Sequence, residues 1–167
     1  MFKLALDVYY KENKACVAGV LFDDWRAENS LQVFTKSVEV TADYQPGAFY
    51  LRELPCLLSL VLEIPVPIST LVIDGYVHLG STSRPGLGEY LYNEVKTPVI
   101  GVAKKYFKDT PEDWGILRGK SSKPLYVSSM GIDHAVAKCH IKDMSGNHRI
   151  PTILKDVDRL CRDSWEK

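Results

Sequence analysis

Three acidic residues occupy positions where a carboxylate is costly unless it binds a partner. Asp7 lies inside an apolar run over residues 4–10, Asp74 ends another over 70–73, and Glu53 opens a helix-like run. A carboxylate in an apolar strand costs several kcal/mol if nothing pairs with it. Two such strands and one helix predict that the acids converge. Converging carboxylates attract hard divalent cations such as Mg²⁺, typically for metal-assisted phosphate chemistry.

The first forty residues predict three strands. Runs rich in Val, Leu, Phe and Tyr cover residues 3–10, 15–23 and 30–40, and short polar breaks separate them. Connections this short are typical of antiparallel neighbours. We therefore expect an antiparallel meander that carries Asp7 on its first strand.

The remaining elements alternate between helix and strand. A helix is expected to run to about residue 62, with Pro55 in its first turn, where proline is tolerated. The later pattern predicts strands over 70–73, 98–103 and 124–129, helices over 89–95, 134–142 and 153–163, a loop over 81–88 and a polar connection over 104–123. This order predicts an α/β fold with some parallel pairing in a mixed sheet flanked by helices.

Bulk composition is that of an ordinary globular protein. With 167 residues, 46% hydrophobic and 25% charged, the chain is expected to form a single domain over residues 1–167. The formal net charge is zero, so no global field attracts nucleic acid, although a local basic groove is sufficient for binding.

The cysteine pattern and the first residues of the sequence predict the cellular compartment. Four widely spaced cysteines form no CxxC pair, so we expect buried free thiols. No signal peptide and no apolar run long enough to span a membrane is visible. We expect a cytoplasmic protein that is a monomer.

The element order resembles the ribonuclease H-like fold, and local segments resemble the endonuclease V family more specifically. Five segments resemble those of the family in its own order and cover nearly the whole chain: YQPG with RELP (44–55), DG (74–75), PVIGVAK (98–104), PLYVS (124–128) and IP with KDVDRL (150–160).

This resemblance implies a metal-dependent endonuclease. Family members hydrolyse the phosphodiester one linkage beyond deoxyinosine or inosine on its 3′ side, leaving 3′-hydroxyl and 5′-phosphate ends. Asp7, Glu53 and Asp74 match the catalytic and metal-binding acids, and Asp158 matches the fourth metal ligand, with Asp156 as a competing candidate. The expected cofactor is Mg²⁺, for which Mn²⁺ substitutes. Two divalent ions about 3.5–4 Å apart can activate water and stabilise the leaving oxygen.

Further residues match substrate-binding positions of the family. Lys104 matches the lysine that contacts the scissile phosphate, a role that suits an ammonium group. Tyr44 and Pro46 match the wedge that separates strands, where a ring stacks on bases. Gly47 and Gly75 are expected to let the backbone approach an extruded base. A structural turn is the alternative for residues 44–47.

The connection after residue 103 is locally basic. Its cations are Lys105, Lys108, Arg118, Lys120 and Lys123. They form either a patch that follows the nucleic-acid backbone, with Lys105 as the contact nearest Lys104, or a plain surface loop.

The chain departs from the family pattern in its substrate-reading parts. Asp43 and Gln45 give the wedge a more polar tip, and Glu89 stands where a family histidine is expected. The family loop after the DG segment is not recovered, and His78 and Arg84 are the candidates for its role. The acids are thus intact while base recognition is altered.

Three functions follow from these observations. The first is an endonuclease acting near deaminated purines in DNA or RNA. The second is a structure-selective nuclease with relaxed base preference, and the third is a catalytically weak nucleic-acid-binding relative. The choices between DNA and RNA and between single and double strands stay open, because 2′-hydroxyl contacts leave no sequence motif.

Overall fold

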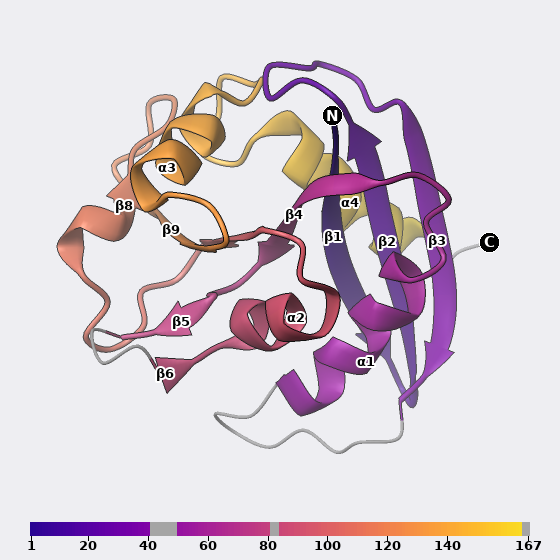
Figure 1. Cartoon of the computed structure of the whole chain (residues 1–167). Coiled ribbons are helices and arrows are strands. Elements are labelled where there is room, and N and C mark those ends of the chain that lie inside the picture. Colours follow the sequence, from indigo (N-terminus) through magenta and orange to yellow (C-terminus); the bar gives the residue numbers. More distant parts are fainter. Residues whose placement is uncertain (41–49, 81–83, 165–167) are drawn as a thin grey trace.

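The computed structural model describes residues 1–40, 50–80 and 84–164, which form a seven-stranded mixed sheet flanked by helices (Figure 1). The sheet order is β3-β2-β1-β4-β7-β9-β8, and β5 and β6 form a separate hairpin. The strands are β1 (Phe2–Lys11), β2 (Lys14–Phe22), β3 (Gln32–Glu39), β4 (Ile68–Asp74), β5 (His78–Leu79), β6 (Arg84–Pro85), β7 (Val99–Ala103), β8 (Gly115–Ile116) and β9 (Leu125–Met130). The helices are α1 (Tyr50–Val61), α2 (Leu87–Val95), α3 (His134–Asp143), α4 (Thr152–Asp163) and the 3₁₀ helix η1 (Glu112–Trp114).

The predicted mixed sheet is confirmed. Strands β1, β2 and β3 pair antiparallel in sequence order, as the short polar breaks predict. Strand β4 then pairs parallel with β1, and β7 pairs parallel with β4. Strand β9 returns antiparallel to β7. Because parallel neighbours need a crossover, α1 and α2 lie between the strands they connect in sequence.

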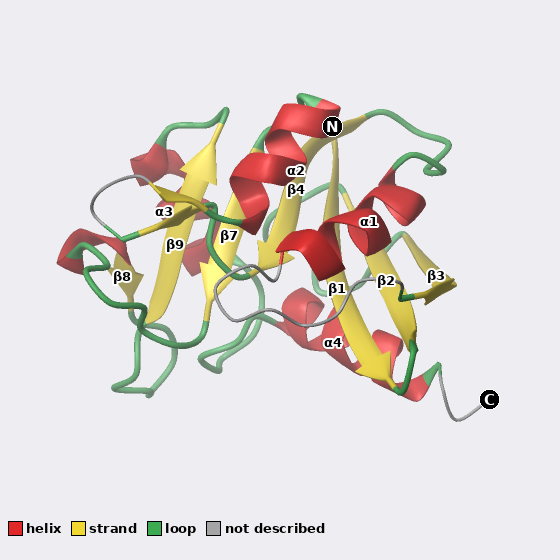
Figure 2. Ribbon diagram, turned by 90° about the horizontal axis from the view of Figure 1, so that it is seen from below, coloured by secondary structure: helices red, strands yellow, loops and turns green. Residues whose placement is uncertain are grey.

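Two apolar layers cover the two faces of the sheet. Helices α1 and α2 pack on one face, around residues such as Leu4 and Leu6 of β1. Helices α3 and α4 pack on the other face, around residues such as Ala5 and Val72. Figure 2 shows α1 and α2 on one side of the strands and α4 beneath β1 and β2. Since strand side chains alternate, this arrangement decides which residues face α4.

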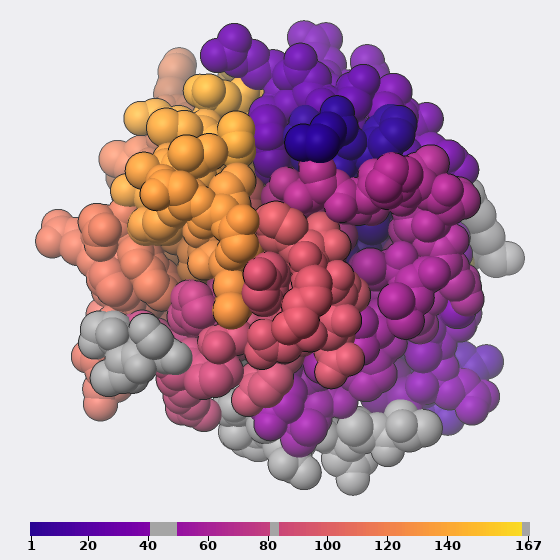
Figure 3. Space-filling view, in the orientation of Figure 1, coloured from indigo at the N-terminus to yellow at the C-terminus, as the bar shows by residue number. Residues whose placement is uncertain are grey.

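The loop after β2 joins the amino-terminal strands to α3. The Trp25 ring stacks on His140 at 4.5 Å between ring centroids. Arg26 Nη2 lies 3.6 Å from Asp143 Oδ2, and its carbonyl accepts a hydrogen bond from Ser145 Oγ. Figure 3 shows this seam, where the orange segment meets the indigo and violet strands. No helix in the described ranges is long and apolar enough to cross a membrane.

Three expectations about elements are wrong. The expected loop over 81–88 contains strand β6 and the start of α2. Helix α1 begins at Tyr50 among the described residues, so Pro55 lies in the second turn rather than the first. A proline there removes the amide hydrogen that would bond to the Leu51 carbonyl. The segment 104–123 is not only a polar connection, because it contains η1 and the edge strand β8. Elements of two or three residues are too short to show a periodic pattern.

Arg118 is buried rather than part of a basic surface, which corrects its expected place in a patch or surface loop. Its side chain is 5% exposed and donates hydrogen bonds to four backbone carbonyls between α3 and α4, those of Met144, Gly146, His148 and Arg149. Burial lowers the pKa of this guanidinium. The Arg118 side chain therefore holds the segment that leads into α4.

We predict that Arg118→Met destabilises the fold by about 2–4 kcal/mol, because buried carbonyls lose charged donors. The measurement is urea unfolding followed by circular dichroism. Lys120→Met is the matched control on an exposed neighbour and should shift the free energy of unfolding by no more than about 0.5 kcal/mol. Equal effects of the two substitutions would contradict a structural role for Arg118.

Candidate active site

The parallel pairing of β1 and β4 brings two of the predicted acids together. Leu6 pairs with Ile73, so Asp7 and Asp74 occupy the next position on each strand. Asp7 shares a face with Ala5, and Asp74 shares a face with Val72, because side chains alternate along a strand. Both acids therefore lie toward α4 where the parallel pairing of β1 and β4 ends, and Asp74 is the last residue of β4. The carboxyl end of a parallel strand is a common place for ligand sites in α/β sheets.

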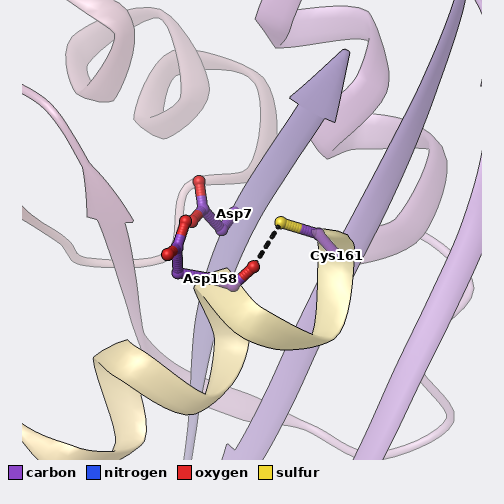
Figure 4. Close-up of side chains that lie close together, drawn as sticks. All are labelled: Asp7, Asp158 and Cys161. Carbon is purple, nitrogen blue, oxygen red and sulfur yellow. Dashed lines mark hydrogen bonds between the residues drawn. The ribbon is translucent and has the colours of Figure 1, made fainter. Parts of the chain in front are cut away.

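Helix α4, which packs on the sheet face toward which Asp7 and Asp74 point, adds a third acid, Asp158. It packs across β1 and β2, with Val157 and Cys161 buried against the sheet. Asp7, Asp158 and Cys161 each offer one ligand atom, and these atoms lie within 4.8 Å of one another. Figure 4 shows the two carboxyl groups facing each other, with the sulfur beside them.

The helix phase separates Asp158 from Asp156. Two residues correspond to about 200° of rotation around an α-helix, so the two side chains leave α4 on different sides. Within the described residues, Asp158 belongs to the cluster of possible metal ligands and Asp156 does not. Arg162 Nε donates to Asp158 Oδ1 at 3.2 Å and fixes that carboxyl group. The geometry therefore favours Asp158 as the fourth acid.

The site raises the pKa of two acids. Burial, followed by the charge of Asp74, raises the pKa of Asp7 to about 8, although the Val8 amide donates to its carboxylate. Burial and the charge of Asp74 likewise raise the pKa of Glu53 to about 7, while Arg52 lowers it. Clustered carboxylates that repel one another are the donor set for a divalent cation, which would keep them ionised.

Lys104 joins the acids from the next strand. It directly follows β7, and its Nζ lies 3.4 Å from Asp74 Oδ2. The side chains are 39% and 44% exposed, so this ion pair contributes little to stability. The ammonium group is thus available to an anionic substrate.

Asp74 and Lys104 lie between two hollows. A small one is also lined by Asp7 and Val157. A larger pocket of about 530 Å³ opens on their other side, lined by Tyr50, Glu53, Gly75, Tyr76, Leu79, Pro85, Gly86, Leu87, Ala103, Lys105, Tyr106 and Phe107. Its volume falls in the range of small-molecule sites, roughly 300–1,000 Å³. Two of the predicted acids, Glu53 and Asp74, therefore border a pocket that is mostly apolar.

The backbone around Gly75 is held by residues to which sequence reasoning gave no role. Gly75 has φ of 130°, and a Cβ there would meet nothing within 4 Å. A Cβ on Gly101 would lie 2.5 Å from the Gly75 carbonyl oxygen. Ser128 Oγ accepts a hydrogen bond from the Val77 amide at 2.9 Å. A glycine inside an otherwise apolar strand is the sequence signal for this close approach.

Arg149 is a second residue that the sequence analysis missed. Its guanidinium donates to the carbonyls of Lys104, Lys123 and Pro124. It thereby ties the segment before α4 to the backbone of the residue that carries the site ammonium. No periodic pattern marks it, and only its place next to Ile150 in a quoted segment could have drawn attention.

Other predicted binding residues have mixed outcomes. Tyr44, Pro46 and Gly47 lie outside the described residues. Lys105 is exposed at the pocket, and its carbonyl accepts from Tyr76 Oη at 2.7 Å. His78 Nδ1 lies 3.0 Å from Glu89 Oε2, so this candidate pairs with the acid that stands where a family histidine is expected.

Comparison of the sequence with known proteins identifies the family to which this chain belongs. The family model for endonuclease V matches residues 4–118. Endonuclease V of Streptomyces avermitilis is 30% identical over 180 residues, which cover 94% of this chain and 77% of the relative. The chain belongs to the endonuclease V family. It is therefore an endonuclease.

Solved structures of the family share the fold. The crystal structure of the Streptomyces avermitilis endonuclease V has a TM-score of 0.83 at 28% identity, over 99% of this chain and 82% of the other. Endonuclease V of Ciona intestinalis, in complex with a 24mer DNA containing an inosine followed by a ribo-adenosine, has a TM-score of 0.80 at 20% identity, over 99% and 86%.

We predict that Gly101→Ala lowers nuclease activity, because its Cβ displaces the Gly75 carbonyl beside Asp74. The cost in unfolding free energy should be about 1–3 kcal/mol, as in other overpacked interiors. Steady-state cleavage and urea unfolding are measured together. Gly19→Ala is the control, since the atoms nearest its Cβ would be side-chain methyl groups of Leu60, Leu4 and Leu6 rather than backbone. Loss of activity in both variants to the same degree would contradict a local effect.

We also predict that the metal-free protein loses stability as pH rises. The pKa of folded Asp7 is about 8 against an ordinary 3.8, so the folded state holds its proton more tightly. The contribution of protonated Asp7 to the free energy of unfolding is fully present below pH 3.8 and is lost as the pH rises toward 8. Urea unfolding in chelator at about pH 5 and about pH 8 measures the slope. Asp7→Asn should flatten this slope, and an unchanged slope would show that Asp7 is not its source.

Proposed function

We propose that this protein is a metal-dependent endonuclease that hydrolyses the phosphodiester bond 3′ to deoxyinosine or inosine, leaving 3′-hydroxyl and 5′-phosphate ends. The observation that carries the proposal is that Asp74 and Lys104 line both a small hollow with Asp7 and a 530 Å³ pocket with Glu53. Acids and an ammonium group suit phosphate chemistry, and the adjacent apolar pocket suits a base.

The acids are the proposed ligands of Mg²⁺, with Mn²⁺ as a substitute. Asp7, Asp74, Glu53 and Asp158 would hold the ions, because oxygen donors suit both cations. Burial first, and then the charge of Asp74, raises the pKa values of Asp7 and Glu53, and a bound cation would offset both effects. When bound, such ions lower the pKa of water and neutralise charge on the phosphate.

Lys104 is proposed to bind the scissile phosphate. Its Nζ lies beside Asp74 and is open to solvent, so a phosphate oxygen can replace the carboxylate as its partner. Arg149 would support this role by holding the Lys104 carbonyl in place. The charge of the phosphate is then shared between an ammonium group and the acid-bound cations.

The larger pocket is proposed to receive the deaminated base. Its floor near Gly75 has open space where a side chain would stand, so the backbone can approach a ring closely. Phe107 and Tyr76 offer apolar surface for stacking. The inosine-containing DNA bound by the Ciona intestinalis relative supports this assignment. Lys105 and the wedge residues Tyr44, Pro46 and Gly47 are the proposed contacts to the strand outside the pocket.

A relaxed nuclease is the second candidate. His78 of the altered segment and Glu89 of α2 lie 3.0 Å apart and partner each other, which leaves fewer polar groups to distinguish one base from another. The family activity ranks first because a pocket of the right size lies beside the acids.

The proposed setting is a monomer in the cytoplasm that acts in repair of deaminated adenine or on inosine-containing RNA. All four cysteines are free, including the exposed Cys139, which suits a reducing compartment.

The test is cleavage of labelled DNA and RNA strands that carry one inosine, with Mg²⁺ or Mn²⁺, beside inosine-free strands. We expect a cut beyond the inosine that needs metal. Asp74→Asn and Asp158→Asn should each reduce the rate at least about 100-fold, since even outer partners of metal sites cost 10–100-fold. Asp156→Asn is the matched control on α4 and should retain activity.

Three outcomes would contradict parts of this proposal. Cleavage without preference for inosine favours the relaxed nuclease. Binding without cleavage in every reaction favours a non-catalytic relative. A loss in Asp156→Asn that equals the loss in Asp158→Asn would reject the assignment of Asp158.

A further inference from the structure

A buried thiol completes the cluster between β1 and α4. We propose that Cys161, with Asp7 and Asp158, forms a site for thiophilic divalent cations of the zinc type, which compete there with Mg²⁺. This inference rests on the proposed metal role of Asp7 and Asp158 and adds a selectivity that carboxylates alone would not give.

The ligand atoms come from two elements that pack on each other. Cys161 follows Asp158 by three residues on α4, so both side chains lie on the same helix face, and Asp7 reaches them from β1 (Figure 4). Their ligand atoms lie within 4.8 Å of one another. Around a tetrahedral zinc ion, oxygen and sulfur ligands bound at 2.0–2.3 Å stand roughly 3.3–3.6 Å apart. Shifts of about 1 Å in the side chains would therefore close the site.

The cluster has an inner wall and an open side. Cys161 is 1% exposed, so its sulfur faces the cluster from the protein interior. The Asp158 side chain is 35% exposed, and Asp7 lines the small hollow together with Asp74 and Lys104. A cation can therefore enter from the hollow, where the remaining coordination positions would face solvent or substrate.

The sulfur decides which cations gain from this arrangement. Mg²⁺ prefers oxygen ligands in near-ideal octahedral geometry and gains nothing from a thiol. Thiolate sulfur favours softer ions such as Zn²⁺. Binding breaks the hydrogen bond that Cys161 Sγ donates to the Asp158 carbonyl, and the thiol proton passes to solvent as the metal–sulfur bond forms. A zinc-type cation bound in this way would occupy Asp7 and Asp158 and so prevent them from binding Mg²⁺.

Cys56 offers a control of nearly identical setting. It follows Glu53 by three residues on α1, is 2% exposed, and donates from Sγ to the Arg52 carbonyl. Among the described residues, however, its sulfur belongs to no group of three possible ligand atoms. Burial and spacing from an acid are thus matched, while the convergence of three ligand atoms is found at Cys161.

The experiment uses Cd²⁺, a thiophilic analogue of Zn²⁺ whose bond to sulfur absorbs in the ultraviolet. The full chain carries Cys139→Ser to remove the exposed thiol. Metal-free protein is titrated with Cd²⁺ by absorbance and calorimetry, alone and against Mg²⁺. We expect one sulfur-bound Cd²⁺ that Mg²⁺ displaces. Cys161→Ser should abolish the absorbance and weaken Cd²⁺ at least about tenfold, with Mg²⁺ affinity changed by less than about threefold.

The control variant Cys56→Ser should keep both the absorbance and the Cd²⁺ affinity. Absorbance that persists in Cys161→Ser, or equal losses of Cd²⁺ and Mg²⁺ affinity, would overturn the proposal. Cys161→Ala, which adds no buried hydroxyl, repeats the comparison if the serine variant folds poorly. The readout needs no substrate, so a protein that binds Cd²⁺ through Cys161 but cleaves no inosine strand would support this site while rejecting the proposed nuclease specificity.

Discussion

The parallel pairing of β1 with β4 sets two carboxylates side by side, and much of the surrounding structure follows from that juxtaposition. Asp7 and Asp74 directly follow the paired residues Leu6 and Ile73 on neighbouring strands. The charge of Asp74 raises the pKa of Asp7. Burial and mutual repulsion both oppose ionisation of Asp7. The Val8 amide, which donates to the Asp7 carboxylate, offsets only part of this cost. A fold that keeps such a cluster is organised around a cation or around a shared proton.

Positioning of the cluster depends on backbone contacts more than on side-chain ion pairs. Gly101 lets β7 approach the Gly75 carbonyl, and Ser128 holds the next amide of that loop. On the other side, Arg149 joins Lys104 to the segment before α4, which Arg118 holds from within the protein. These are contacts to main-chain groups, which cannot change rotamer. They therefore fix the strand ends more firmly than the exposed pair between Lys104 and its acid could.

The sequence predicted the elements with strong periodicity or long apolar runs, and with them the placement of three acids. Strand β4 and helix α4 were found because their apolar patterns are continuous. Strand β8 was missed because two residues carry no pattern. The charge of Arg118 predicted a surface position, yet its guanidinium satisfies buried carbonyls, a distinction that composition does not carry. The choice between Asp156 and Asp158 needed the rotational phase of α4, which only packing determines.

A second contact, one step along the same pair of elements, agrees with that phase. Arg162 pairs with Asp158 one helical turn earlier and lies over the Tyr9 ring, 4.9 Å from its centroid. Tyr9 is two residues beyond Asp7 and so shares its face of β1. Four helical residues rise about 6.0 Å, and two strand residues about 6.6–6.8 Å. The contacts between Asp7 and Asp158 and between Tyr9 and Arg162 are therefore in step. The cation–π contact adds to the buried packing of Val157 and Cys161, which turns Asp158 toward Asp7.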